Sequence, residues 1–251
     1  MMDMRFGTGG CGNPGAAMLP LLITFTAMPA FDVRLPIAPY RLSGVVYGAL
    51  LNHRPELEAL GTAVNEPPYK APPRAPVLQI KPRNTLARDG DAITVPAGVA
   101  ALVMGATLGI VIGRTACCVA AEQALHVVAG YTIVNDVSVP VPGHYRPSVR
   151  LRARDGFCPI SAEVRQIHDP DALRVELRID GQLVQQGSTA ERVRGVAQLI
   201  ADVTDFMTLQ AGDLLLLGAS ADAPLARAGQ QVEITIEGLG SLRNHLVEAG
   251  A

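Results

Sequence analysis

The segment Leu173-Arg-Val-Glu-Leu-Arg-Ile179 alternates apolar and charged side chains, and Asp180-Gly181 separates it from a second run, Leu183-Val-Gln-Gln186. Strict alternation is typical of a strand that buries one face. Asp-Gly favours the tight turn that joins two antiparallel strands. The sequence therefore predicts a β-hairpin whose first strand lies against a hydrophobic core.

Short apolar runs continue on both sides of this hairpin. They predict further strands at residues 45–51, 77–80, 92–95, 102–112, 131–137, 214–217 and 232–236. Gly105, Gly109 and Gly113, in or just after the run 102–112, indicate bulges or a close approach of another backbone. Five prolines between residues 61 and 76 predict an extended loop there.

Two segments have helical patterns. Ser188-Thr-Ala-Glu191 is a capping-box sequence, and apolar residues then recur at spacings of three and four as far as Met207. This pattern predicts an amphipathic helix of about five turns, and residues 119–128 fit a shorter helix. Because the strands and helices do not alternate strictly, the fold class expected is α+β, a mixed β-sandwich or roll with a few flanking helices.

Composition excludes several classes of protein. The 251 residues carry a formal net charge of -2, so no basic surface points to nucleic acid. No run of 18 apolar residues predicts a membrane span. The four cysteines show neither a C-x-x-C motif nor metal-ligand spacing, and the adjacent Cys117 and Cys118 would form a strained disulfide. The simplest interpretation is a reducing compartment, and we expect a cytoplasmic protein.

Residues 1–35 differ from the rest of the chain. A Gly-rich stretch precedes an apolar run that contains Pro20 and Pro29. The segment is interpreted as a flexible extension or the product of a mis-annotated start, with a secretory signal as the alternative. Residues 36–251 are expected to form a single domain.

Several polar clusters could carry chemistry. Asn135-Asp136 ends an apolar strand, so Asp136 is either a ligand for a hard cation such as Mg²⁺ or a turn residue. Residues 146–154 hold four arginines in a chain of net negative charge, which points to an anionic ligand. The alternative for Arg152 and Arg154 is a solvated ion pair with Asp155.

Two further strand ends carry candidate groups. Lys81 is either a second carboxylate-binding point or an ordinary charge at a strand end. Asn52-His53 could contribute polar groups to a site, although a lone histidine is more often structural.

These segments also carry a family resemblance. Residues 44–240 resemble the fumarylacetoacetate hydrolase (FAH) superfamily through five motifs in the same order. The motifs are Val77-Leu-Gln-Ile-Lys-Pro82, Gly130-Tyr-Thr-Ile-Val-Asn-Asp-Val-Ser138, Asp155-Gly-Phe-Cys-Pro159, Gln185-Gln-Gly-Ser-Thr-Ala190 and Phe206-Met-Thr-Leu-Gln-Ala-Gly-Asp213.

The resemblance implies a β-roll fold and a divalent cation (Mg²⁺, Mn²⁺ or Ca²⁺) that polarises a 2-oxo acid. It implies catalytic roles for the residues Arg152, Asp155, Lys81 and Glu56. It implies substrate contacts for the residues Asn52, His53, Tyr131, Thr189 and Arg154.

The chain departs from the family pattern at the metal. The two glutamates of the family's E-x-E fall on Gly105 and Thr107, so Asp136 is the one carboxylate retained and metal binding is expected to be weak or absent. The family's histidine falls on Glu56, its lysine on Arg152, and the threonine of its G-T-P loop on Ala219.

Narrower motifs, among them Pro68-Tyr-Lys-Ala-Pro-Pro73 and Ile80-Lys-Pro-Arg-Asn-Thr85, resemble the N-terminal half of two-half FAH proteins of 4-hydroxyphenylacetate (homoprotocatechuate) catabolism. The resemblance implies decarboxylation of 5-oxopent-3-ene-1,2,5-tricarboxylate, a polycarboxylic 2-oxo acid, with isomerisation of 2-hydroxyhepta-2,4-diene-1,7-dioate in the full assembly. It also implies a homodimer, or a hetero-oligomer with a C-terminal-type FAH subunit. The alternatives are a degenerate partner of a metal-binding paralogue and another FAH-type hydrolase or hydratase.

Overall fold

A computed structural model describes residues 44–141, 143, 148–220 and 222–250. The expected boundary near residue 35 and the predicted anion-binding Arg146 lie outside these residues. Among the described residues, no helix is both long and apolar enough to cross a membrane.

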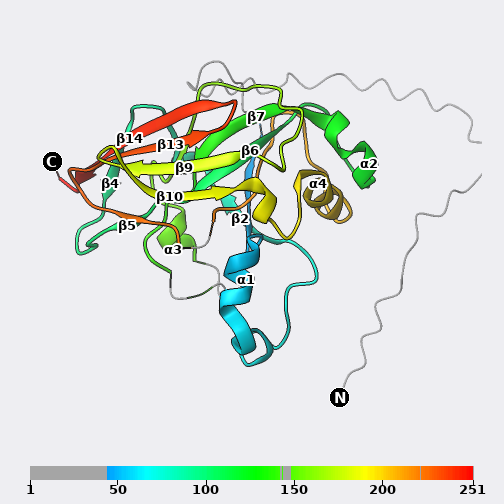
Figure 1. Cartoon of the computed structure of the whole chain (residues 1–251), viewed down its shortest axis with the longest axis horizontal. Helices are drawn as coiled ribbons and strands as arrows, with labels where there is room; N and C mark the ends of the chain where they lie inside the picture. The colour runs from blue at the N-terminus through cyan, green and yellow to red at the C-terminus, as the bar shows by residue number, and fades with distance from the viewer. Residues whose placement is uncertain (1–43, 142, 144–147, 221, 251) are drawn as a thin grey trace, which may run out of the picture. The chain divides into compact units, whose positions relative to one another are not determined.

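Two mixed β-sheets organise the described chain (Figure 1). The seven-stranded sheet contains, in spatial order, β2 (Val77–Lys81), β1 (Val46–Leu50), β11 (Leu214–Leu216), β6 (Ala106–Ile112), β7 (Val128–Asn135), β8 (Cys158–Ile160) and β3 (Leu86–Arg88). The five-stranded sheet contains β10 (Gln182–Ser188), β9 (Arg174–Ile179), β13 (Gln231–Ile236), β14 (Gly240–Glu248) and β4 (Ala92–Val95). A separate pair joins β12 (Leu225–Ala226) to β5 (Leu102–Val103).

Helices are few and short. They are α1 (Arg54–Leu60), α2 (Ala121–Ala124), α3 (Val149–Arg152) and α4 (Val196–Thr204), with 3₁₀ turns at Gly61–Asn65, Arg83–Thr85, Leu125–Val127 and Thr189–Glu191. Helix α1 begins with a proline in its first turn, where the missing N–H costs nothing. Helices α2 and α4 pack side by side (Figure 1). The expected α+β class with mixed sheets is confirmed.

The main core lies between the two sheets. Leu108 and Ile110 of β6 face it from the larger sheet, and Leu177 of β9 and Ile234 of β13 face it from the smaller one. Every residue of β6 is buried. On the other face of its sheet, side chains such as Val134 and Leu216 form a second apolar cluster. The central strands therefore provide a rigid support for the side chains at their ends.

The predicted hairpin is confirmed. Strands β9 and β10 pair antiparallel, and both turn residues, Asp180 and Gly181, have positive φ, as the tight turn requires. Residues of β9 alternate between buried and more exposed, and the buried ones face the core. Here local pattern and tertiary packing agree.

The long helix predicted after Ser188 is wrong in its start. The capping box is present, but it closes only the single 3₁₀ turn Thr189–Glu191. The backbone at Arg192 then forms an antiparallel bridge with His53, and the N–H of Val193 donates to the carbonyl of Asn52. Pairing with this distant segment holds the chain extended until α4 begins at Val196.

The other corrections are also tertiary in origin. The single strand predicted at 102–112 is two strands, β5 and β6, interrupted at Met104–Gly105, where Gly105 contacts the backbone of Asp136. The helix predicted at 119–128 ends earlier, since Val128 already belongs to β7. Helix α1 and the 3₁₀ turn after it, the latter inside the expected loop, were not predicted. Nor was β14, because the inward-facing Asn244 interrupts its apolar alternation.

Candidate active site

A small cavity forms where several elements of the larger sheet end. Its volume is about 90 Å³, and its polar lining includes Glu56 of α1, Asp136 just after β7, Arg152 of α3 and Ser220. Gly105, at the junction of β5 and β6, lines the same cavity. The fold thus brings together three of the charged residues that the sequence predicted, from segments far apart in the chain.

Asp136 is the centre of the polar cluster. One carboxylate oxygen, Oδ1, lies 2.6 Å from the ammonium of Lys81, and the other, Oδ2, accepts a hydrogen bond of 2.5 Å from the Gln79 amide. Arg152 places Nη1 3.8 Å from Oδ2. Asp136 is only 5 % exposed, so its buried charge is compensated by these groups rather than by water.

Lys81 lies behind Asp136, away from solvent. Its ammonium donates to the backbone carbonyls of Val137, Arg152 and Phe157, at 3.0, 3.2 and 3.0 Å, in addition to the Asp136 contact. Three N–H donors therefore face four acceptors. These contacts indicate that Lys81 holds Asp136 and α3 in place. They leave no N–H of Lys81 for a substrate carboxylate.

Asn52 and Thr189 also hold the fold together. The Asn52 amide donates to the carbonyls of Arg194 and Leu217, both at 2.9 Å, and its oxygen accepts from the N–H of Arg194. The Thr189 hydroxyl accepts from the N–H of Leu173 at 2.8 Å. Neither lines the cavity, and both side chains bond to backbone groups; their predicted substrate contacts stay a prediction.

His53 and Tyr131 are likewise buried away from the cavity lining. His53 Nε2 lies 3.2 Å from the carboxylate of Glu191. Burial raises the pKa of Tyr131 to about 12, and the negative charge of Asp171 adds to the increase. Tyr131 therefore stays protonated beside Asp171, and the structure does not bring it to Asp136.

Asp155 and Arg154 lie on the outer side of α3. Asp155 is exposed and accepts a hydrogen bond of 2.7 Å from the Asn84 amide, while Arg154 donates to the carbonyl of Arg150. Neither lines the cavity.

Cys158 is fully buried, and burial raises the pKa of its thiol to about 12, so it is a packing residue rather than a nucleophile.

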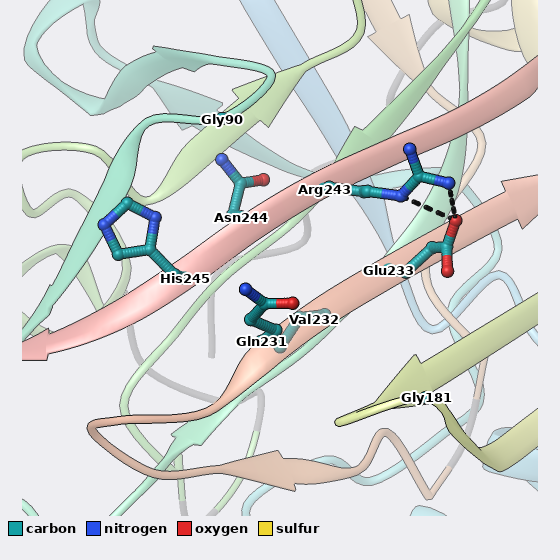
Figure 2. A pocket seen from close by; sticks show the side chains of 8 residues that line it. All are labelled: Gly90, Gly181, Gln231, Val232, Glu233, Arg243, Asn244 and His245. Carbon is teal, nitrogen blue, oxygen red and sulfur yellow. Dashed lines mark hydrogen bonds and ion pairs between the residues drawn. The ribbon is translucent and has the colours of Figure 1, made fainter.

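A larger hollow of about 270 Å³ lies elsewhere, along β13 and β14. Figure 2 shows its lining, in which the only ion pair joins Arg243 to Glu233. The Asn244 amide donates to the carbonyls of Arg88 and Asp91. The charged groups here are paired on a sheet surface, and none of the predicted site residues lines this hollow.

Comparison with known proteins agrees with the fold. The model of the fumarylacetoacetate hydrolase C-terminal family matches residues 45–247. This chain belongs to the fumarylacetoacetate hydrolase family.

Relatives within the FAH family extend this result. The chain is 39% identical over 206 residues to the 4-hydroxyphenylacetate degradation bifunctional isomerase/decarboxylase of Salmonella dublin, covering 82% of this chain and 48% of that protein. It therefore spans about half the length of this relative.

Solved structures agree. The 2-hydroxyhepta-2,4-diene-1,7-dioate isomerase of Mycobacterium marinum matches with a TM-score of 0.66 and 28% identity, over 82% of this chain and 75% of that one. The fumarylpyruvate hydrolase of Pseudomonas aeruginosa, solved with Mn²⁺ and pyruvate, shares the fold at a TM-score of 0.70 and 21% identity, over 82% of this chain and 90% of that one.

The divalent cation that the FAH family implies does not fit the donors of this chain. Both oxygens of Asp136 are engaged by Lys81 and Gln79, and a neighbouring ammonium repels a cation. The Thr107 hydroxyl donates to the carbonyl of Gly218 at 2.9 Å and accepts from its N–H. Within the described ranges, no group of three or more His, Cys, Asp or Glu side chains could hold a metal ion.

Gly105 adds a steric reason. A Cβ atom built there would lie 2.6 Å from the carbonyl oxygen of Asp136 and 3.1 Å from the Cβ of Ala219. A side chain at position 105 would therefore force the backbone to shift. The space beside position 105 is therefore too small for a glutamate side chain unless the backbone moves.

Gln79 and Arg192 are polar residues of this region that the sequence did not predict. Gln79 lies two positions before the predicted Lys81 in a strand, so the two side chains share a face, and that spacing could have identified Gln79. Gly48 makes room for it, since a Cβ there would lie 3.0 Å from the Gln79 amide nitrogen. Arg192 is almost completely buried, and no local pattern marks it, because an arginine after a capping box is ordinarily solvated.

Proposed function

We propose that this chain is the decarboxylase-type subunit of 4-hydroxyphenylacetate (homoprotocatechuate) meta-cleavage catabolism, acting on 5-oxopent-3-ene-1,2,5-tricarboxylate. The observation that carries the proposal is the placement of Arg152 in the cavity, held by a rigid cluster around Asp136. The identity to a bifunctional isomerase/decarboxylase supports it. Assignment to the N-terminal half rests on motifs such as Pro68–Pro73 and stays a prediction.

The chemistry needs positive charge more than a base. The carboxylate that leaves as CO₂ is attached to the saturated carbon next to the carbon–carbon double bond, and that double bond is conjugated to the 2-oxo group. Its bonding electrons move through that double bond to the carbonyl oxygen, and protonation of the oxygen gives 2-hydroxyhepta-2,4-diene-1,7-dioate. A guanidinium beside the 2-oxo acid stabilises the developing negative charge and binds carboxylate with two parallel hydrogen bonds.

Arg152 suits this role. Its side chain is 14% exposed, so charge interactions in the cavity are weakly screened. Its Nε donates to the Ser148 hydroxyl at 3.1 Å, which orients the guanidinium plane. Lys81 bonds to backbone carbonyls and holds Asp136 in place. Besides Asp136, Glu56 is the one carboxylate among the described residues that line the cavity.

One observation favours a second candidate function. The metal donors are missing at positions 105 and 107, and the space at 105 is closed. A subunit with this site could serve mainly to complete the assembly of a metal-binding FAH paralogue. Other FAH-type hydrolase or hydratase reactions are less compatible with the structure, since the resemblance assigns their chemistry to the cation.

The test is CO₂ release from the tricarboxylate by the purified chain, in Mg²⁺ and in EDTA. Turnover in EDTA, reduced at least tenfold by Arg152→Gln and unchanged by Arg227→Gln, supports the proposal. Arg227 is an exposed arginine that is not part of the cavity lining, and it provides the matched change of charge. Turnover that appears only after mixing with a metal-binding paralogue supports the partner role, and no turnover in any mixture contradicts both.

A further inference from the structure

Arg192 is a buried arginine without an adequate partner. It is 2% exposed, and its Nε and Nη1 atoms have no hydrogen-bond partner among the described residues. Within the part of the chain that the structure describes, its guanidinium makes one hydrogen bond, a long one of 3.5 Å from Nη2 to the Ser220 hydroxyl. A buried guanidinium has five N–H donors, and leaving most of them unpaired costs stability.

The neighbouring carboxylates do not resolve this deficit. Glu191 directs its Oε2 to His53 at 3.2 Å and to the N–H of Ser188 at 3.3 Å, and its side chain is 46% exposed. Burial lowers the pKa of Arg192 to about 10, and the charges of Glu191 and Glu56 only partly oppose the decrease. Arg192 therefore remains protonated near neutral pH, as an undercompensated buried cation.

The fold fixes Arg192 in this position. Its backbone pairs with His53, and the Asn52 side chain binds Arg194 on one side and Leu217 on the other. These contacts hold the segment of Arg192 beside the loop that contains Ser220. Arg192 itself does not line the cavity. Ser220, which accepts its hydrogen bond, and Glu56, whose charge acts on it, both belong to the cavity lining.

We propose that Arg192 binds a second carboxylate of the substrate, so that Arg152 and Arg192 together select dicarboxylic over monocarboxylic 2-oxo acids. This inference rests on the proposed function for the chemical class of the ligand. A carboxylate accepts up to four hydrogen bonds and would satisfy the unpaired Nε and Nη1 donors of Arg192. An incoming carboxylate also supplies the charge that the buried guanidinium lacks.

The test compares two non-reacting probes of equal length, 2-oxoheptanedioate and 2-oxoheptanoate, by titration calorimetry. The wild-type chain is expected to bind the diacid at least tenfold more tightly. Arg192→Gln is expected to weaken diacid binding at least tenfold and leave monoacid binding within twofold, which abolishes the discrimination. Arg227→Gln is the control for loss of one positive charge and is expected to retain it.

A thermal unfolding series guards against a purely structural effect. Arg192→Leu is expected to keep or raise the midpoint of unfolding, because replacing an unpaired buried charge by an apolar side chain removes its desolvation cost. It is also expected to lose diacid discrimination. A folded Arg192→Gln that still prefers the diacid overturns the inference, as does a wild-type chain that binds neither probe or both equally.

The outcomes also separate this inference from the proposed function. Preference for the diacid that depends on Arg192, in a chain without CO₂ release, supports the inference while the decarboxylase proposal fails. Full turnover with discrimination unaffected by Arg192→Gln overturns the inference alone.

Discussion

At the scale of single residues, the site is a set of buried charges whose compensation is uneven. Lys81 and Asp136 lie 2.6 Å apart, and the remaining Lys81 donors reach backbone carbonyls. Breaking such a pair leaves the other charge buried and uncompensated. Arg192 has the opposite character, since it is buried without a matched carboxylate. The first arrangement supports the fold, and the second needs a ligand.

The buried pair gives a stability prediction. Lys81→Ala is expected to lower the free energy of unfolding by about 3–5 kcal/mol, because Asp136 loses its close cation. Urea unfolding followed by circular dichroism measures the change. Arg83→Ala, an exposed basic residue two positions along, is the control and is expected to stay within about 0.5 kcal/mol of the wild type. A similar small loss for both variants would contradict the role given to Lys81.

At the scale of elements, α4 shows how a distant side chain can set where a helix begins. Gly195 has no side chain with which to cap the helix, so Asp171, which precedes β9, accepts a hydrogen bond of 2.9 Å from the N–H of Val196. Burial raises the pKa of Asp171, the hydrogen bond from Val196 lowers it, and the charge of Asp169 raises it, with a net increase. The cap therefore comes from another segment. Because the pKa of Asp171 is raised, the charged form of this cap is less favourable in the folded protein than in water.

This cap has a pH-dependent signature. Because the folded-state pKa of Asp171 is raised, its ionisation costs the folded state, and stability falls as the pH rises from the ordinary aspartate pKa through the raised value. Asp171→Asn keeps an acceptor and is expected to remove this decrease. Asp171→Ala is expected to lose about 0.5–2 kcal/mol from loss of the cap. Urea unfolding between about pH 4 and pH 7 covers the window.

Asp205→Asn removes an exposed carboxylate at the other end of α4 and serves as the control. It is expected to keep the wild-type slope. If Asp171→Asn also kept that slope, the raised pKa would not be coupled to folding.

At the scale of the whole molecule, the chain keeps the FAH fold while the metal donors are lost. The arrangement of strands and helices matches the fold of the fumarylpyruvate hydrolase of Pseudomonas aeruginosa, which was solved with Mn²⁺. In place of an E-x-E, this chain has Gly105 against the Asp136 backbone and Thr107 bonded to Gly218. A fold held by its core tolerates such changes, because positions 105 and 107 contribute no side chain to either apolar cluster.

The donor set predicts poor metal binding. Titration calorimetry of the full chain with Mg²⁺ and then Mn²⁺ is expected to give dissociation constants no tighter than roughly 0.1 mM, the range of weak oxygen-donor sites. Asp136→Asn is expected to change this background little, since Lys81 and Gln79 already engage the carboxylate. A micromolar dissociation constant that is lost in Asp136→Asn would contradict the conclusion that a divalent cation does not fit these donors.

The sequence by itself determined the elements whose evidence is local. The alternation in Leu173–Ile179 and the Asp180-Gly181 turn predicted the β9–β10 hairpin, because side-chain period and turn chemistry act between near neighbours. The family motifs predicted membership of the FAH family, which the family match confirms. The assignment of the family's metal ligands to positions 105, 107 and 136 stays a prediction.

Only the tertiary structure decided which polar residues face the cavity and which hold the backbone. Asn52 and Lys81 looked like ligand-binding groups in the sequence, yet carbonyls far along the chain take their donors. No local pattern marked Arg192, yet its side chain is buried where its backbone pairs with His53. A side chain's role depends on the acceptors and the exclusion of water around it, and segments distant in sequence supply both.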